Sequence, residues 1–166
     1  MFKYLVNKIP HHTIMVDGSP YLTRYFLDGE PIHQLGERGH VYLHHFHASD
    51  QIHELHNHPW SATSLILRGG YVEESMRIGE PIRSRVYRVG DVNHIAMDTF
   101  HRVSLLGDTW TLCRVSQRQQ EWGFVNRDSG KYRQFNSQAE TAALRVVDIL
   151  RAETDATTVF RPERGR

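Results

Sequence analysis

Apolar and polar residues alternate in short stretches along most of the chain before residue 126. Turn-forming residues, such as Asp17-Gly18-Ser19-Pro20 and Gly107-Asp108, separate these stretches. Side chains of a strand point alternately to its two faces, so each stretch predicts a strand with one buried face. We therefore expect an all-β protein, with six to eight antiparallel strands closed into a barrel over residues 13–125.

The pattern changes after Ser137. Ser137-Gln-Ala-Glu140 forms a capping box, and the apolar residues that follow have helical spacing. We expect a helix to about Glu153, then a disordered tail. The length of 166 residues fits one domain. Residues 1–136 then form the barrel with an N-terminal strand extension, and residues 137–166 form the helix and tail of the same domain.

His56 and His58 are the most informative residues. Residues i and i+2 of a strand point to the same face, so both imidazoles can bind one metal. The alternative is that they decorate a solvated strand face. An apolar run, Leu65-Ile66-Leu67, and Gly69-Gly70 follow, and His101 lies in a second short segment. This context favours a metal site formed by His56, His58 and His101.

The spacing of these residues resembles the two motifs of the cupin superfamily. The first motif, G-x5-H-x-H-x3,4-E-x6-G, places His56 and His58 at its ligand positions, Thr63 at its glutamate and Gly70 at its last glycine. The second, G-x5-P-x-G-x2-H-x3-N, places Gly90 at its first glycine and His101 at its ligand histidine. The glutamate, the proline, the inner glycine and the asparagine are replaced.

The resemblance implies a cupin-type antiparallel jelly roll that binds a divalent metal. Cupins without the glutamate resemble the three-histidine thiol dioxygenases, which implies Fe(II). Three neutral imidazoles also suit Zn(II), Ni(II) or Mn(II). If Thr63 points into the barrel, its neutral hydroxyl leaves a coordination position open.

Residues around this site suggest further roles. His94 and Tyr71 are candidates for proton transfer, and Arg114 is a third candidate catalytic residue. His94 is alternatively a fourth ligand or a solvated strand residue. Candidate substrate-binding residues are Trp60, Thr63, Arg83 and Arg85. Trp60 either packs in the core or stacks on substrate, and the two arginines are either solvated or bind an anionic group.

The sequence leaves open the orientation of one predicted strand. In residues 40–47 the even positions carry His40 and His44 and the odd positions carry His45 and His47, and the sequence does not show which set faces the interior. Residues 71–76 predict a strand with a charged outer face.

Composition narrows the function. The net charge of +1 argues against nucleic acid or an anionic membrane as a partner, and no window is long and apolar enough to span a bilayer. The single cysteine fits a cytoplasmic protein. Twelve histidines indicate a metal site or a pH-sensitive surface. Edge strands and the apolar helix face predict a homodimer.

Three functions fit these features. The first is a non-haem Fe(II) dioxygenase or other oxygenase acting on a small polar or anionic substrate. The second is a lyase, isomerase or epimerase that uses the metal as a Lewis acid. The third is a cupin that binds a small molecule without catalysis.

Overall fold

The computed structural model describes Val6 and residues 8–28, 39–50 and 53–135. This part of the chain contains twelve β-strands. The chain divides into two compact units, Met1–Gln134 and Phe135–Arg166. The helix and tail predicted after Ser137 lie outside the described residues. Within the described residues, no helix is long and apolar enough to cross a membrane.

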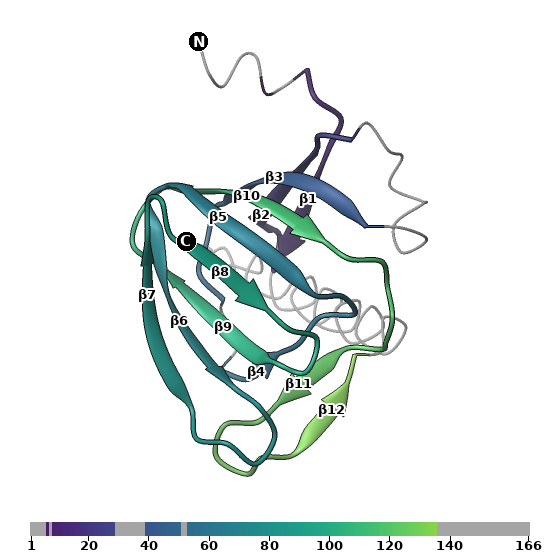
Figure 1. Cartoon of the computed structure of the whole chain (residues 1–166), viewed down its shortest axis with the longest axis vertical. Helices are drawn as coiled ribbons and strands as arrows, with labels where there is room; N and C mark the ends of the chain where they lie inside the picture. Colours follow the sequence, from purple (N-terminus) through teal and green to yellow (C-terminus); the bar gives the residue numbers. More distant parts are fainter. Residues whose placement is uncertain (1–5, 7, 29–38, 51–52, 136–166) are drawn as a thin grey trace, which may run out of the picture. The chain divides into compact units, whose positions relative to one another are not determined.

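Six strands form the first antiparallel sheet (Figure 1). In spatial order they are β1 (His11–Val16), β2 (Ser19–Phe26), β3 (His40–Phe46), β10 (Thr109–Val115), β5 (Ala62–Arg68) and β8 (Val92–Ile95).

The other six strands form the second antiparallel sheet. Their order is β12 (Tyr132–Gln134), β11 (Gly123–Val125), β4 (Leu55–His56), β9 (Phe100–Leu105), β6 (Gly70–Met76) and β7 (Arg83–Arg88). The prediction of an all-β, antiparallel fold is confirmed.

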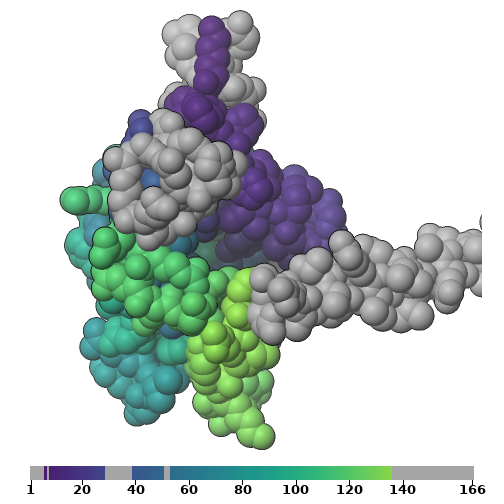
Figure 2. Space-filling model, turned by 90° about the vertical axis from the view of Figure 1, so that its right-hand side faces the viewer, coloured from purple at the N-terminus to yellow at the C-terminus, as the bar shows by residue number. Residues whose placement is uncertain are grey.

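The predicted strand number is too low because hairpins extend both sheets at their edges. The β1–β2 hairpin turns at Asp17 (φ 49°) and Gly18 (φ 73°), and Val16 pairs with Ser19. Two successive residues with positive φ fit a type I′ turn, which suits the twist of adjacent strands. The β11–β12 hairpin extends the second sheet, and Figure 2 shows both hairpins, in purple and yellow-green, at the surface.

The core lies between the two sheets. One cluster combines Ile66 of the first sheet with Tyr71, Tyr87 and Val103 of the second. A second cluster covers the inner face of the first sheet, with Trp60 packed against it. Its buried members are Phe26, Tyr42, Ala62, Ile95, Cys113 and Val115.

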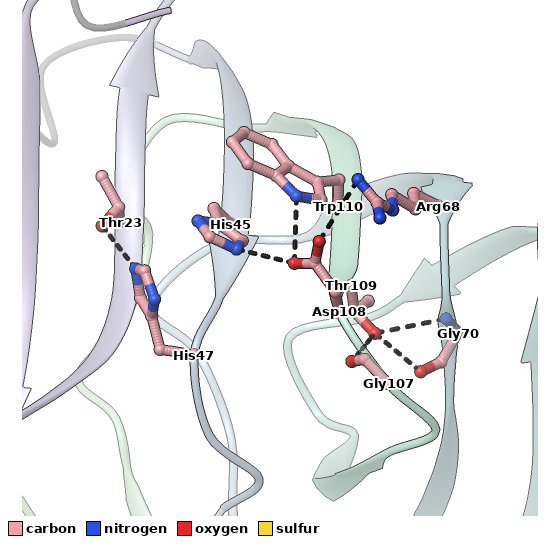
Figure 3. Close-up of polar contacts among 9 residues, drawn as sticks. All are labelled: Thr23, His45, His47, Arg68, Gly70, Gly107, Asp108, Thr109 and Trp110. Atoms are coloured by element: carbon pink, nitrogen blue, oxygen red, sulfur yellow. Dashed lines mark hydrogen bonds and ion pairs between the residues drawn. The ribbon is translucent and has the colours of Figure 1, made fainter. Parts of the chain in front are cut away.

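The orientation of β3 follows from this core. Tyr42 is 1% exposed and belongs to the inner cluster, so His40 and His44, which share its face, point inward and are also buried. His45 and His47 point outward. Figure 3 shows them on the outer face: His47 Nε2 lies 2.8 Å from Thr23 Oγ1, and His45 Nε2 lies 2.8 Å from Asp108 Oδ1.

Gly69 and Gly70 carry the chain from the first sheet into the second. Both have positive φ, at 69° and 143°, and a Cβ on Gly70 would collide with the carbonyl oxygen of Tyr87. The Thr109 hydroxyl fixes the crossing, since it accepts a hydrogen bond from Gly70 N (3.2 Å) and lies 2.9 Å from Gly70 O (Figure 3). Glycine is therefore required here by both backbone conformation and space.

Candidate metal centre

The structure brings His56, His58 and His101 together. His56 lies in β4 and pairs directly with His101 of β9, and His58 follows two residues after His56. One ring nitrogen from each residue lies within 4.8 Å of the others. This is the one group of three or more His, Cys, Asp or Glu residues in the described part of the chain that has metal-binding proximity.

Asn57, between the two histidines, anchors the segment that carries them. Its side chain is buried, at 6% exposed. Asn57 Oδ1 accepts a hydrogen bond from Gly123 N (2.8 Å), and Nδ2 donates to Met97 O (3.2 Å). Gln120 Nε2 donates to His58 O (2.8 Å) and Met97 O (2.7 Å). Asn57 therefore joins its own segment to β11 and to the loop at Met97, a role that the spacing of the motif does not reveal.

The distances among the imidazoles suit a metal. His58 Nε2 and His101 Nε2 lie 2.9 Å apart. Two nitrogens that bind one ion at about 2.1 Å are separated by roughly 3.0–3.4 Å in octahedral or tetrahedral geometry. The two lone pairs can therefore converge on one ion with little movement.

Glu73 determines which ring nitrogen of His101 is available to bind a metal. Its carboxylate, 4% exposed, lies on the inner face of β6 and accepts a hydrogen bond from His101 Nδ1 (2.7 Å). Asn93 Nδ2 donates to the same carboxylate oxygen (2.9 Å) and to Tyr71 OH (3.1 Å). With Nδ1 protonated, His101 presents the Nε2 lone pair to His58. We call His101, Glu73, Asn93 and Tyr71 the Glu73 network.

Glu73 was missed in the sequence. Residues 71–76 were expected to carry their charges on the outer face, and this is correct for Glu74, which pairs with Arg127 (2.7 Å) and Arg102 (3.4 Å). It is wrong for Glu73. The signal that could have found it is alternation, because Glu73 shares a strand face with the buried Tyr71.

The other two imidazoles are kept neutral. Burial lowers the pKa of His56 to about 4, with a further contribution from His101. Burial, His56 and His101 together hold the pKa of His58 well below its usual range. Asp50 Oδ2 lies 4.0 Å from His56 Nδ1, too far for a hydrogen bond, and instead accepts one from Val103 N (2.6 Å). Neutral imidazoles are the form that binds metal.

Three of the predicted site residues lie on the outer face of the first sheet. Thr63, His94 and Arg114 are exposed neighbours on β5, β8 and β10, and Thr63 Oγ1 lies 3.1 Å from His94 Nδ1. The expectation that Thr63 points into the barrel is wrong. Side chains alternate along β5, where Ala62, Ser64 and Ile66 are buried, so Thr63 points outward. His94 and Arg114 are likewise on the wrong side of the sheet to reach the three imidazoles.

The remaining candidates divide into two groups. Arg83 and Arg85 are exposed on the edge strand β7, where Arg83 lies near Glu80 (3.9 Å) and Arg85 stacks over Tyr87 (4.7 Å). Trp60 and Tyr71 line the interior. The Trp60 ring is parallel to the His58 imidazole at 6.4 Å, and burial raises the pKa of Tyr71, so its hydroxyl stays protonated.

Comparison with solved structures identifies the class of fold. No family model matches the sequence, and no curated protein matches it. Streptomyces albus HEPD, solved with the substrate 2-hydroxyethylphosphonate and Fe(II), superposes with a TM-score of 0.53 at 12% identity, over 68% of this chain and 25% of that chain. The chain thus has a cupin-type antiparallel fold and spans about a quarter of HEPD.

Two further structures have lower scores. Hydroxypropylphosphonic acid epoxidase from S. wedmorenis has a TM-score of 0.48 at 10% identity, over 67% of this chain and 56% of that chain. The capsular polysaccharide assembling protein CapF from Staphylococcus aureus has a TM-score of 0.47 at 16% identity, over 67% of this chain and 29% of that chain.

Proposed function

We propose that His56, His58 and His101 bind one divalent metal, with Fe(II) favoured, and that the protein is a non-haem oxygenase acting on a small anionic substrate. The observation that carries this proposal is the convergence of three imidazoles, with ring nitrogens within 4.8 Å, in the interior of a cupin-type barrel. Zn(II), Ni(II) and Mn(II) suit the same nitrogen ligands.

The surroundings of the imidazoles fit this metal. Glu73 fixes the orientation of the His101 ring, as carboxylates that hydrogen-bond metal-binding histidines do. The three ligands are neutral, so an Fe(II) ion there would retain its full charge for binding an anionic substrate. HEPD, which shares the fold, holds Fe(II) and a phosphonate substrate, and this supports iron as the first metal to test.

The chain's own residues would then have distinct tasks. Bound Fe(II) would supply the activation of dioxygen. Trp60 provides an apolar wall beside His58, which favours exclusion of water. Tyr71 keeps a protonated hydroxyl that accepts a hydrogen bond from Asn93 (3.1 Å), so it is our candidate proton donor.

Anaerobic reconstitution with Fe(II) tests the proposal. The reconstituted protein should hold about one iron per chain and consume dioxygen with at least one member of a panel of thiol, hydroxy and keto acids and phosphonates. A His101→Ala variant should do neither, whereas the outer-face variant His94→Ala should behave as wild type.

Other outcomes point to the alternative functions. Tight retention of Zn(II) or Ni(II) without oxygen consumption would contradict an oxygenase and favour a lyase or isomerase. Failure to bind any of the four metals would contradict the metal site itself. The remaining function would then be the binding of a small molecule without catalysis.

A further inference from the structure

A row of polar side chains crosses the inner face of the first sheet. Arg24 of β2 pairs with His44 of β3, and His44 pairs in turn with Thr111 of β10. Tyr42 lies two residues from His44 on the same face and stacks against its ring at 5.4 Å. We call these four residues the Arg24 cluster.

Each member of the Arg24 cluster has a buried polar atom without a hydrogen-bond partner in the described structure. The atoms are Arg24 Nε, Tyr42 OH, His44 Nε2 and Thr111 Oγ1. Tyr42 is 1% exposed, His44 8% and Thr111 0%, whereas Arg24 is half-buried with its Nε fully covered. Buried polar atoms in proteins nearly always have a hydrogen-bond partner. Four neighbouring atoms without one therefore indicate that a bound molecule supplies their partners.

The charge of Arg24 is also uncompensated. No carboxylate of a described residue forms an ion pair with it, and its contacts are with the rings of Tyr42 (5.7 Å) and Trp60 (5.9 Å). Burial lowers the pKa of this guanidinium, but arginine remains protonated in proteins. Ring contacts stabilise the charge without satisfying an N–H group, and they offset only part of the cost of removing a cation from water.

The Arg24 cluster faces the proposed metal centre. Trp60 neighbours both, because its ring centre lies 5.9 Å from the Arg24 guanidinium carbon and 6.4 Å from the parallel His58 ring. Arg24 also contributes to the lowered pKa of both His58 and His44. A small molecule bound at the imidazoles would therefore have a free cation nearby.

We propose that Arg24 anchors the anionic group of the substrate, a carboxylate or a phosphonate, and that Tyr42, His44 and Thr111 complete its hydrogen bonding. This inference rests on the proposed function for the metal, although the anion site itself does not need one. The planar guanidinium matches either anion with paired hydrogen bonds. Burial raises the pKa of Tyr42 to about 12, so its hydroxyl can donate. Thr111 can donate as well, and neutral His44 can do so from Nε2.

Thermal unfolding of the metal-free protein is the first test. If Arg24 is an unpaired ligand-binding cation, Arg24→Met should raise the unfolding midpoint by about 2–4 °C, because it removes a half-buried charge that has no counter-ion among the described residues. Arg114→Met on the outer face is the matched control and should leave the midpoint nearly unchanged. If Arg24→Met instead lowers the midpoint, Arg24 holds the fold together and the inference is wrong.

Titration of the same proteins is the second test, with glycolate and methylphosphonate as anionic probes and ethylene glycol as the neutral one. Both wild type and Arg114→Met should bind at least one anion saturably and bind it at least about tenfold more tightly than Arg24→Met does. The preferred probe identifies the anion. Equal binding by Arg24→Met, equal binding of ethylene glycol, or no saturable anion binding would each overturn the inference.

Metal stoichiometry separates this inference from the proposed function. Arg24→Met should bind as much metal as wild type, because it changes none of the three imidazoles. If anions bind through Arg24 in a protein that takes up no metal, the proposed function fails and the anion site stands. If metal binds normally and anion binding does not depend on Arg24, the anion site alone fails.

Discussion

Two polar clusters in the barrel interior differ in whether their hydrogen bonds are complete. In the Glu73 network, His101, Glu73, Asn93 and Tyr71 form an unbroken chain with distances of 2.7–3.1 Å. In the Arg24 cluster, each of the four members leaves a buried polar atom unpaired in the described structure.

This difference in hydrogen bonding indicates that the two clusters have different functions. A satisfied network stabilises one arrangement of its members, so His101 has its tautomer and orientation fixed before any metal arrives. Unpaired buried groups carry a free-energy cost that a complementary ligand removes on binding. The first cluster is built to hold a metal ligand in place, and the second is built to receive a molecule from outside.

The largest effect on metal affinity is expected from a substitution in the Glu73 network. Glu73→Gln keeps the shape of the side chain but removes the negative charge that supports His101, so metal affinity should fall about 10–100-fold. Competition with a chromogenic chelator measures this. Glu74→Gln is the control, because Glu74 is the next residue on β6 but pairs outward with Arg127. Equal losses in the two variants would mean that Glu73 has no special link to the metal.

A smaller effect, on the pH dependence of stability, is expected when His44 of the Arg24 cluster is replaced. Burial and Arg24 hold its pKa well below the value of about 6.5 in an unfolded chain. Between these two pKa values the unfolded state binds more protons, so stability falls as the pH drops below about 6.5. His44→Gln should therefore flatten the fall in the free energy of unfolding of the metal-free protein. Denaturant titrations from pH 7 to 5 test this, and an unchanged slope would show that His44 is not buried as a neutral group.

The smallest effect is expected at Thr63. On the cupin motif alone, a glutamate there should add a metal ligand and fill an open coordination position. The structure places Thr63 outside, beside His94 and Arg114, so Thr63→Glu should leave metal affinity unchanged and stability within about 0.5 kcal/mol. A clear gain in metal affinity would show that Thr63 faces inward after all.

The sequence predicts the fold class and the convergence of three histidines for good physical reasons. Alternation identifies strands without knowledge of their partners, and the pair His56 and His58 shares a face by the same rule. His101 could be added because the spacing of two motifs resembled a known family. Thr63 was placed inside on motif spacing alone, whereas the burial pattern of β5 puts Ser64 inside and Thr63 outside.

The polar residues of the interior were harder to predict. Arg24 lies in the N-terminal part that was expected to extend the barrel, and Arg83 and Arg85 were the candidates for binding an anionic group. Alternation places Arg24 on the same face as Leu22 and Phe26, both buried, but which face is inner depends on pairing with β3. Strand pairing over long sequence distances is not contained in any local pattern.

Metal stoichiometry in single-histidine variants tests the central claim most directly. His56→Ala, His58→Ala and His101→Ala should each reduce bound metal from about one per chain to near zero, because two imidazoles alone do not hold a divalent ion tightly. His94→Ala, an exposed histidine of β8, should retain full occupancy. If two of the three variants keep their metal, the three imidazoles are not the ligands and the account of this site is wrong.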